Sequence, residues 1–352
     1  MCRVWFLADT HFGVKNDNEM WLEDFTGYFN DVVIPLMRRE HRDGDILVHL
    51  GDVFDNRSTV GLNTICKTID IFDELSGIFD DIRIIIGNHD ILNKSTNTIT
   101  SVRVLERIPN IRIYYTPVVE VVGGKTVLFN PWVNDPDSER RLLASVDADY
   151  IFGHLDVSGC QLNRSGVRSN SENSIDTKEF KNSVVYAGHI HKRQDNKNVH
   201  YVGTPYQMSR NEMDDVKGIT VLGVATGGTE FFENTYSPRF KVFSIYEMLD
   251  KTVGELKSEW DNVFVDLNVK GSDYIHCKFD SLMEELAGHF KEFSIHSDNT
   301  DTIPEAADAG CDNPDNGKAT EEHIREWLEE NDVDDNRSDK VMELYMKYKE
   351  NL

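Results

Sequence analysis

The stretch Ile82-Arg83-Ile84-Ile85-Ile86-Gly87-Asn88-His89-Asp90 is the part of the sequence that decides the fold. Its run of isoleucines predicts a buried strand over 82–86, and Gly87 lets the backbone turn sharply where that strand ends. Asn88, His89 and Asp90 then place a neutral oxygen, an imidazole and a carboxylate side by side. Taken alone, the tetrapeptide is equally compatible with a polar turn that caps a strand, so its meaning depends on the other strand ends.

Strands and helices alternate along the first quarter of the chain. Hydrophobic periodicity predicts strand 3–8, helix 19–40, strand 45–50, helix 61–76 and strand 82–86. Pro35 is expected to kink or break the first helix, because proline lacks the N–H that a helix interior needs. This order of elements predicts an α/β fold with a parallel sheet and functional residues at the carboxyl ends of its strands.

The rest of the chain predicts more strands and then a second domain. We expect short strands over 111–130 with a hairpin turn at Gly123-Gly124, and a polar loop over 158–175. Further strands are predicted over 149–153, 184–188, 199–203, 218–224 and 229–235. The predicted domains are a first domain over 1–237, a small α+β domain over 238–296, an acidic flexible linker over 297–318 and a helical segment over 319–352.

The composition of the chain disfavours several classes of protein. The 352 residues include no apolar run near the roughly 20 residues that span a bilayer, and no signal-peptide pattern, so we expect no membrane partner. The five cysteines are scattered and odd in number, which favours reduced thiols in a cytoplasmic protein. The net charge of −25 disfavours nucleic-acid binding unless bound metals or a partner supply positive charge.

Five polar clusters each follow a predicted strand. They are Asp9-x-His11, Gly51-Asp52, Asn88-His89-Asp90, Gly153-His154 and His189-x-His191. Residues i and i+2 of an extended segment project to the same side, so the first and last clusters can each aim two ligands at one point. A mixed Asp, His and Asn set suits manganese, iron or zinc, whereas calcium prefers oxygen ligands alone. Each cluster alone is ordinary, but all five together predict a metal site.

With these clusters, the sequence resembles the calcineurin-like metallophosphoesterases. Gly51-Asp52-Val53-Phe54-Asp55, Gly87-Asn88-His89-Asp90 and Gly188-His189-Ile190-His191 followed by Gly203-Thr204-Pro205 are similar to the SbcD/Mre-type DNA exonuclease branch. The start Asp9-Thr10-His11-Phe12-Gly13-Val14-Lys15 is similar to recombination endonuclease subunits of T4-like phages. The resemblance implies a four-layer αββα metallophosphoesterase sandwich, a small α+β capping domain that binds DNA, and C-terminal helices that bind a partner.

The same resemblance implies roles for individual residues. Metal one would take Asp9, His11 and His191; metal two would take Asn88, His154 and His189; and Asp52 would bridge the two ions. His89 and Asp90 would be catalytic, His89 by meeting the reacting phosphate or the leaving oxygen and Asp90 by orienting His89. Asp55 is left without a role. The ions would be two divalent metals, with Mn2+ expected and Mg2+ as the alternative.

The leading hypothesis is a manganese-dependent DNA exonuclease and endonuclease. It would be the catalytic subunit of a DNA recombination, repair and replication complex, in the bacterial cytoplasm if phage-encoded. Its partners would be DNA and an SbcC/Rad-type ABC ATPase bound through the C-terminal helices, with a homodimer inside a heterotetramer. The alternatives are a phosphoesterase that acts on phosphoproteins or nucleotides, and a non-catalytic scaffold for the ATPase.

Several other features of the sequence need an interpretation. The helix face of Ile65, Ile69 and Phe72 is either core or a dimer contact, and His49 is expected to be a core histidine. Six basic residues near the motif loops either contact DNA phosphates or are surface charge: Lys15, Arg57, Arg103, Arg164, Arg168 and Arg210.

Overall fold

The computed structural model describes residues 2–93, 96–162, 164–171, 173–269, 285–286 and 290–297. The chain divides into two compact units, Met1–Asp298 and Asn299–Leu352, and every described residue belongs to the first. The predicted segment 319–352 and all but the first residue of the predicted linker 297–318 therefore lie outside the described residues. The predicted boundary near residue 237 stays a prediction.

The first sheet has six strands in the order β14-β13-β1-β2-β3-β6. Its parallel part is β1 (Arg3–Leu7), β2 (Ile46–His49), β3 (Ile82–Ile85) and β6 (Ile111–Tyr114). β13 (Gly218–Gly223) joins β1 antiparallel, and β14 (Thr229–Glu233) pairs antiparallel with β13. The predicted parallel sheet is therefore present, and its strands β1, β2 and β3 point their carboxyl ends at one edge.

The second sheet also has six strands, in the order β11-β12-β10-β9-β8-β7. They are β7 (Val118–Val122), β8 (Lys125–Asn130), β9 (Tyr150–His154), β10 (Val184–Gly188), β11 (Gln194–Asn196) and β12 (Val199–Tyr201). β7 and β8 form the predicted hairpin around Gly123 and Gly124, which both have positive φ. β8, β9, β10 and β12 run parallel.

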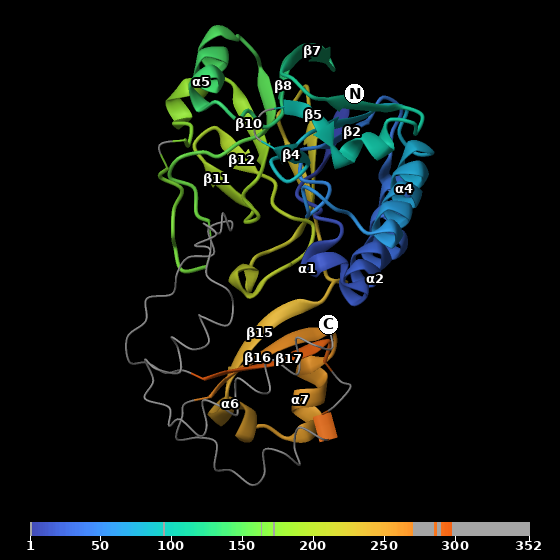
Figure 1. Cartoon of the computed structure of the whole chain (residues 1–352), viewed down its shortest axis with the longest axis vertical. Coiled ribbons are helices and arrows are strands. Elements are labelled where there is room, and N and C mark those ends of the chain that lie inside the picture. The colour runs from blue at the N-terminus through green and yellow to red at the C-terminus, as the bar shows by residue number, and fades with distance from the viewer. Residues whose placement is uncertain are drawn as a thin grey trace, which may run out of the picture. The chain divides into compact units, whose positions relative to one another are not determined.

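Helices and apolar clusters define four layers. Phe6 of β1 stacks on Tyr186 of β10 with ring centroids 4.9 Å apart, so the two sheets pack face to face. On the outer face of the first sheet lie α2 (Glu19–Tyr28), a π-helical turn (Phe29–Val33), α3 (Ile34–Glu40) and α4 (Leu62–Ser76). The second sheet packs on its outer side against α5 (Pro136–Ser145), as Figure 1 shows. The αββα sandwich is confirmed.

Pro35 changes the predicted first helix in an identifiable way. The helix does not break; instead a π-helical turn over Phe29–Val33 precedes Ile34 and the proline. The wider turn accommodates a residue that cannot donate an N–H. The helix starts where the Asn18 side chain accepts hydrogen bonds from the backbone N–H groups of Met20 and Trp21.

Several short elements connect the strands and helices of the two six-stranded sheets. They are α1 (Val14–Asp17), β4 (Ile91–Asn93), β5 (Thr96–Thr100) and the 3-10 turns Ser101–Leu105, Thr177–Phe180 and Arg210–Glu212. β4 and β5 pair as a separate antiparallel hairpin directly after Asp90. No helix in the described part of the chain has the length and apolar character that a membrane crossing needs.

A third, three-stranded parallel sheet follows residue 237. It consists of β15 (Arg239–Ser244), β16 (Val263–Val269) and β17 (Glu292–Ser297). The predicted helix 247–260 is wrong in detail: it is two helices, α6 (Ile245–Leu249) and α7 (Val253–Trp260), because Ser244 and Thr252 each start a helix with a capping box. The predicted helix 279–290 lies almost wholly outside the described residues.

Candidate metal centre

All seven predicted metal ligands lie together at one edge of the two sheets. Asp9 and His11 follow β1, Asp52 follows β2, and Asn88 follows β3. His154 ends β9 and His189 and His191 follow β10, so the second sheet supplies three of the ligands. The side chains form two groups whose ligand atoms lie within 4.8 Å of one another, namely Asp9/His11/His191 and Asp52/His154/His189.

Asn88 is the centre of the second group. Its Oδ1 lies 2.8 Å from His154 Nε2 and 2.9 Å from His189 Nδ1. The other nitrogen of His154, Nδ1, donates a hydrogen bond to the carbonyl oxygen of Leu50 at 2.8 Å. Because that carbonyl can only accept, Nδ1 carries a proton, and His154 would offer the lone pair of Nε2 to a cation only after that second nitrogen has lost its own proton.

In the first group, ligand atoms also face one another across a short distance. The carboxylate of Asp52 lies between the first and the second group. His11 Nε2 and His191 Nε2 face each other at 3.2 Å. Asp52 Oδ2 lies 3.7 Å from His11 Nε2 and 3.3 Å from His154 Nε2, so it contacts both groups. Nitrogen and oxygen lone pairs that converge in this way fit a divalent cation in each group, with Asp52 as the carboxylate between them.

The backbone is bent sharply to bring these ligands together. Asp9, His11, Asp52 and His189 all have positive φ, at 50°, 43°, 55° and 93°. Such conformations cost of order 1–3 kcal/mol each and persist where the surrounding structure imposes them. The close approach also explains Gly87, since a Cβ there would lie 2.0 Å from Asp52 Oδ1.

Buried charge dominates the electrostatics. Burial lowers the pKa of His11 and His154, but the neighbouring carboxylates raise it to about 9 in both. Burial raises the pKa of Asp52, but the adjacent histidines hold it well below its usual value. The carboxylates thus keep protons on two imidazoles that a metal needs deprotonated. Cation binding must release those protons, so metal affinity should rise with pH.

His89 lies beside the predicted ligands, and its ligand atom lies within 4.8 Å of those of His11 and Asp55, so these three side chains form a third group that could hold a cation. Its ring packs edge-on against His11, with centroids 4.8 Å apart. Its Nδ1 lies 2.7 Å from the carbonyl oxygen of Asp55 and must donate to it. The Nε2 atom is therefore the ring nitrogen of His89 that this hydrogen bond does not use. The Asp55 carboxylate has a separate partner, with its Oδ1 3.2 Å from His11 Nδ1.

Comparison with known proteins agrees with this geometry. A family model described as calcineurin-like phosphoesterase matches residues 2–193, more than half of the chain. The chain belongs to the calcineurin-like phosphoesterase family. The protein named Exonuclease subunit 1 of Enterobacteria phage T4 is 24% identical over 307 residues, which are 84% of this chain and 87% of that protein.

Two solved structures of other proteins show weaker likeness. The Aquifex aeolicus protein of unknown function AQ665 has a TM-score of 0.30 and 20% identity, and the match covers 47% of this chain and 83% of that one. The phosphopantetheinyl hydrolase PptH from Mycobacterium tuberculosis has a TM-score of 0.32 and 14% identity over 58% of this chain and 90% of that one. Scores this low say nothing further about the phosphoesterase described here.

Asp90 does not orient His89 as expected. Its Oδ2 accepts the backbone N–H groups of Asp52 and Gly87, both at 2.8 Å. Its Oδ1 accepts those of Val53 at 3.0 Å and Phe54 at 3.3 Å. The carboxylate is fully buried and organises the loop that carries Asp52, while His89 takes its orientation from the Asp55 carbonyl.

Sequence reasoning missed two groups at this phosphoesterase centre. Glu212 Oε1 lies 3.1 Å from His191 Nδ1, and its other oxygen pairs with the buried Lys217 ammonium at 2.7 Å. A carboxylate on the far nitrogen of a ligand histidine fixes its tautomer and orientation. Trp132 packs its ring against His189, with centroids 5.1 Å apart. Pro131-Trp132 directly after a strand that ends at the ligand edge was the available signal.

Four of the six basic residues named above, and His49, have structural partners. Arg103 and Arg164 lie 3.6 Å from Glu106 and Asp214, and Arg210 lies 2.7 Å from Asp266. Arg168 donates to the carbonyl of Gly159. His49 is fully buried with Nε2 3.0 Å from the hydroxyl of Thr10, so its prediction as a core histidine is confirmed.

Proposed function

We propose that this phosphoesterase is a DNA nuclease that hydrolyses phosphodiester bonds with two divalent cations, Mn2+ in first place and Mg2+ as the alternative. The observation that carries the proposal is the pair of ligand groups joined by Asp52. The name Exonuclease subunit 1 of the phage T4 relative supports a nuclease reaction and a role as one subunit of a complex.

The residues divide the chemistry among them. Asp9, His11 and His191 would hold one ion and Asn88, His154 and His189 the other, with Asp52 shared. Two bound divalent ions would polarise the phosphodiester and activate a water for attack. His89 would face the reacting phosphate or the departing oxygen with Nε2, because its Nδ1 is engaged by the Asp55 carbonyl. Burial lowers the pKa of His89, so donation from Nε2 would need a negative phosphate close by to favour the protonated ring.

The local charge at the metal centre explains how an acidic chain could bind a phosphodiester. Within the ligand set the two aspartates, Asp9 and Asp52, carry the negative charge, so two divalent cations leave the centre at about +2. A phosphodiester would therefore meet positive charge at the site although the chain carries −25. Because that charge comes from the ions, chelation should abolish DNA binding at the centre as well as cleavage.

The test is a nuclease assay on end-labelled single-stranded and duplex DNA with Mn2+, with Mg2+ and with excess EDTA. A phosphoserine peptide and a nucleoside monophosphate serve as competing substrates, and Asp9→Ala serves as the metal-site control. We expect Mn2+-dependent DNA cleavage that the control lacks. Turnover of the peptide or nucleotide with intact DNA would instead identify the other phosphoesterase class, and no turnover of any substrate would identify a scaffold.

We also propose an SbcC/Rad-type ATPase as partner, contacted through residues 319–352. The amphipathic sequences there, with Ile324, Trp327 and Leu328 and then Val341, Leu344 and Tyr345, are too short for stable isolated helices. They suit an apolar groove on a partner. Deleting 320–352 should keep Mn2+-dependent nuclease activity and abolish co-purification with the ATPase, and unchanged co-purification would refute the contact.

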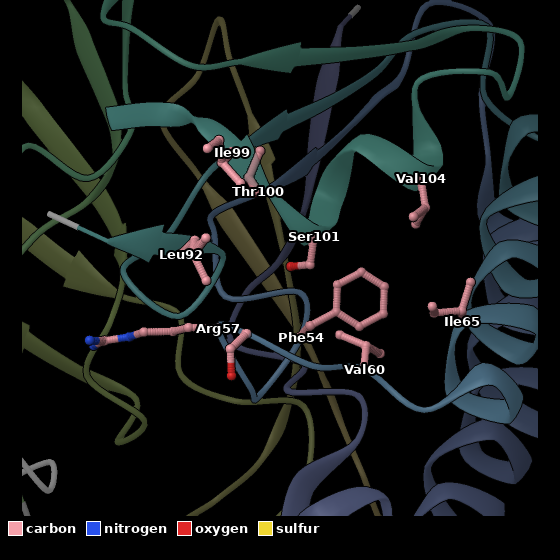
Figure 2. A pocket seen from close by; sticks show the side chains of 10 residues that line it. Phe54, Arg57, Val60, Ile65, Leu92, Ile99, Thr100, Ser101 and Val104 are labelled. Atoms are coloured by element: carbon pink, nitrogen blue, oxygen red, sulfur yellow. The ribbon is translucent and has the colours of Figure 1, made fainter. Parts of the chain in front are cut away.

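A second copy of the chain is proposed to cover an apolar surface beside the site. Figure 2 shows side chains of α4, the β4–β5 hairpin and the following turn around a pocket of about 260 Å3. Leu62 is 77% exposed near it, and Ile99 is 53% exposed on its wall. Leu62→Glu should convert a dimer to a monomer in light scattering, whereas Val121→Glu on the β7 edge should leave the mass unchanged. An unchanged mass for Leu62→Glu would refute this interface.

A further inference from the structure

Trp132 contacts both six-stranded sheets at the edge where the seven predicted metal ligands lie. It follows β8, whose last residue, Asn130, pairs with Gly153 next to the ligand His154. Its backbone N–H donates to the carbonyl of Ile86 at 2.9 Å, one residue before Gly87. The ring centroid of Trp132 is 5.1 Å from His189 and 5.9 Å from His154. The indole therefore borders the proposed second ion.

The indole is held in one orientation by a small amide network. Its Nε1–H donates to Asn134 Oδ1 at 3.0 Å, and Asn134 Nδ2 donates to Asn97 Oδ1 at 3.4 Å. Asn97 Nδ2 donates in turn to the Trp132 carbonyl at 3.2 Å. The hydrogen-bonding capacity of the indole is thus used, so what the ring can offer a substrate is its aromatic surface.

The ring is only partly buried, and indole carries no ligand atom for a metal. A rigid, partly exposed aromatic surface beside a phosphodiester-binding centre suits stacking with a nucleobase, which tolerates any base because each has a π face. We propose that Trp132 stacks on a nucleobase that flanks the scissile phosphate. This inference rests on the proposed DNA nuclease function and adds to it a contact that recognises the nucleotide.

Stacking on Trp132 has a consequence for the substrate. A base inside a duplex already stacks on both neighbours, so one that lies on the indole must have left at least one of them, whereas a base at a duplex end has one face free. The site should therefore favour single strands and frayed ends over closed, well-paired duplex.

The test combines protein variants with substrate variants. Trp132→Leu removes the aromatic surface, and Trp132→Phe retains a smaller one as the matched control. Each is assayed with the parent in single-turnover cleavage of a single-stranded oligonucleotide at saturating Mn2+. Two further oligonucleotides carry an abasic nucleotide on the 5′ or the 3′ side of the scissile phosphate. Mn2+ titration of each protein is measured in parallel.

We expect Trp132→Leu to weaken binding of the normal oligonucleotide about 5- to 150-fold, the range that follows from base–aromatic stacking energies. Trp132→Phe should lose much less affinity for the normal oligonucleotide. The parent and Trp132→Leu should bind one of the two abasic oligonucleotides with equal affinity. Equal losses on normal and both abasic oligonucleotides, or a matching loss of Mn2+ affinity, would overturn the proposal and make Trp132 a packing residue for His189. If the parent cleaves no DNA, the nuclease proposal fails and stacking falls with it.

Discussion

Asp90→Asn is the substitution that separates two accounts of the Gly87–Asp90 turn. In the structure each oxygen of Asp90 accepts two backbone N–H groups, from Asp52 and Gly87 on one and from Val53 and Phe54 on the other. An asparagine keeps one oxygen acceptor and places an NH2 group where the other stood. Whichever way the amide turns, two buried N–H donors would face another donor.

The cost follows from those two donors. A buried N–H left without an acceptor costs about 1–3 kcal/mol, so Asp90→Asn should lower the unfolding free energy by about 2–6 kcal/mol. His89→Gln disturbs one hydrogen bond, to the Asp55 carbonyl, and should cost about 1 kcal/mol. Because the loop carries Asp52, the Asp90 variant should also bind Mn2+ more weakly, whereas the His89 variant should not.

Urea denaturation of the metal-free proteins and calorimetric Mn2+ titration measure the two effects. Single-turnover cleavage at saturating Mn2+ then reports what remains of catalysis in each variant. If Asp90→Asn matches the parent in stability and Mn2+ affinity but loses as much turnover as His89→Ala, Asp90 acts through His89. The loop-organising role read from the hydrogen bonds would then be wrong.

Four further predictions test the site and its support. His89→Ala should lower kcat by about 10²–10⁴-fold with Mn2+ affinity kept, and turnover within a few-fold of the parent would end its catalytic role. Asp52→Ala should lower occupancy at both ion sites in calorimetry, whereas Asp9→Ala should mainly empty one; two ions on the Asp52 variant would exclude bridging. Glu212→Gln should weaken Mn2+ binding about 10- to 100-fold, as its contact with a ligand histidine implies, and unchanged affinity would contradict that. Asp45→Asn should cost about 3–5 kcal/mol at pH 7, because it breaks a buried ion pair. Burial raises the pKa of Asp45 but hydrogen bonds from a guanidinium and an indole lower it overall, so the difference between parent and variant should shrink as pH falls below about 4.

The sequence allowed us to predict that the metal-ligand candidates gather at one edge of the sheet, because hydrophobic periodicity locates the strands and chain order shows that they run parallel. A parallel sheet brings the carboxyl ends of β1, β2 and β3 to one edge whatever the details of packing. The i, i+2 spacing of Asp9 with His11 then needs only an extended or turning backbone. The break between α6 and α7 was not predictable from apolar spacing, because that spacing continues across it; the capping box at Thr252 starts the second helix.

The role of Asp90 could not be predicted in the same way. Its neighbour in the sequence is His89, and adjacency suggested that one acts on the other. In space its carboxylate turns away, towards N–H groups of a loop 36 to 38 residues earlier in the chain. Nothing in the spacing of a tetrapeptide shows which way a side chain leaves a turn, since that depends on which donors the rest of the fold leaves unpaired.

The contact between Glu212 and the predicted ligand His191 could not be predicted from the sequence either. It lies 21 residues from His191, in a 3-10 turn whose sequence carries no metal motif. A buried carboxylate there is tolerable because Lys217 pairs with it at 2.7 Å, and Lys217 also donates to the carbonyl of His191 at 2.9 Å. The ammonium, the carboxylate and the histidine backbone thus form one closed network around a ligand. A buried carboxylate without its cation would be costly, and a cation without the carboxylate equally so. The two charges are therefore explained only together, through His191. A sequence that shows them five residues apart cannot reveal that they enclose a predicted metal ligand.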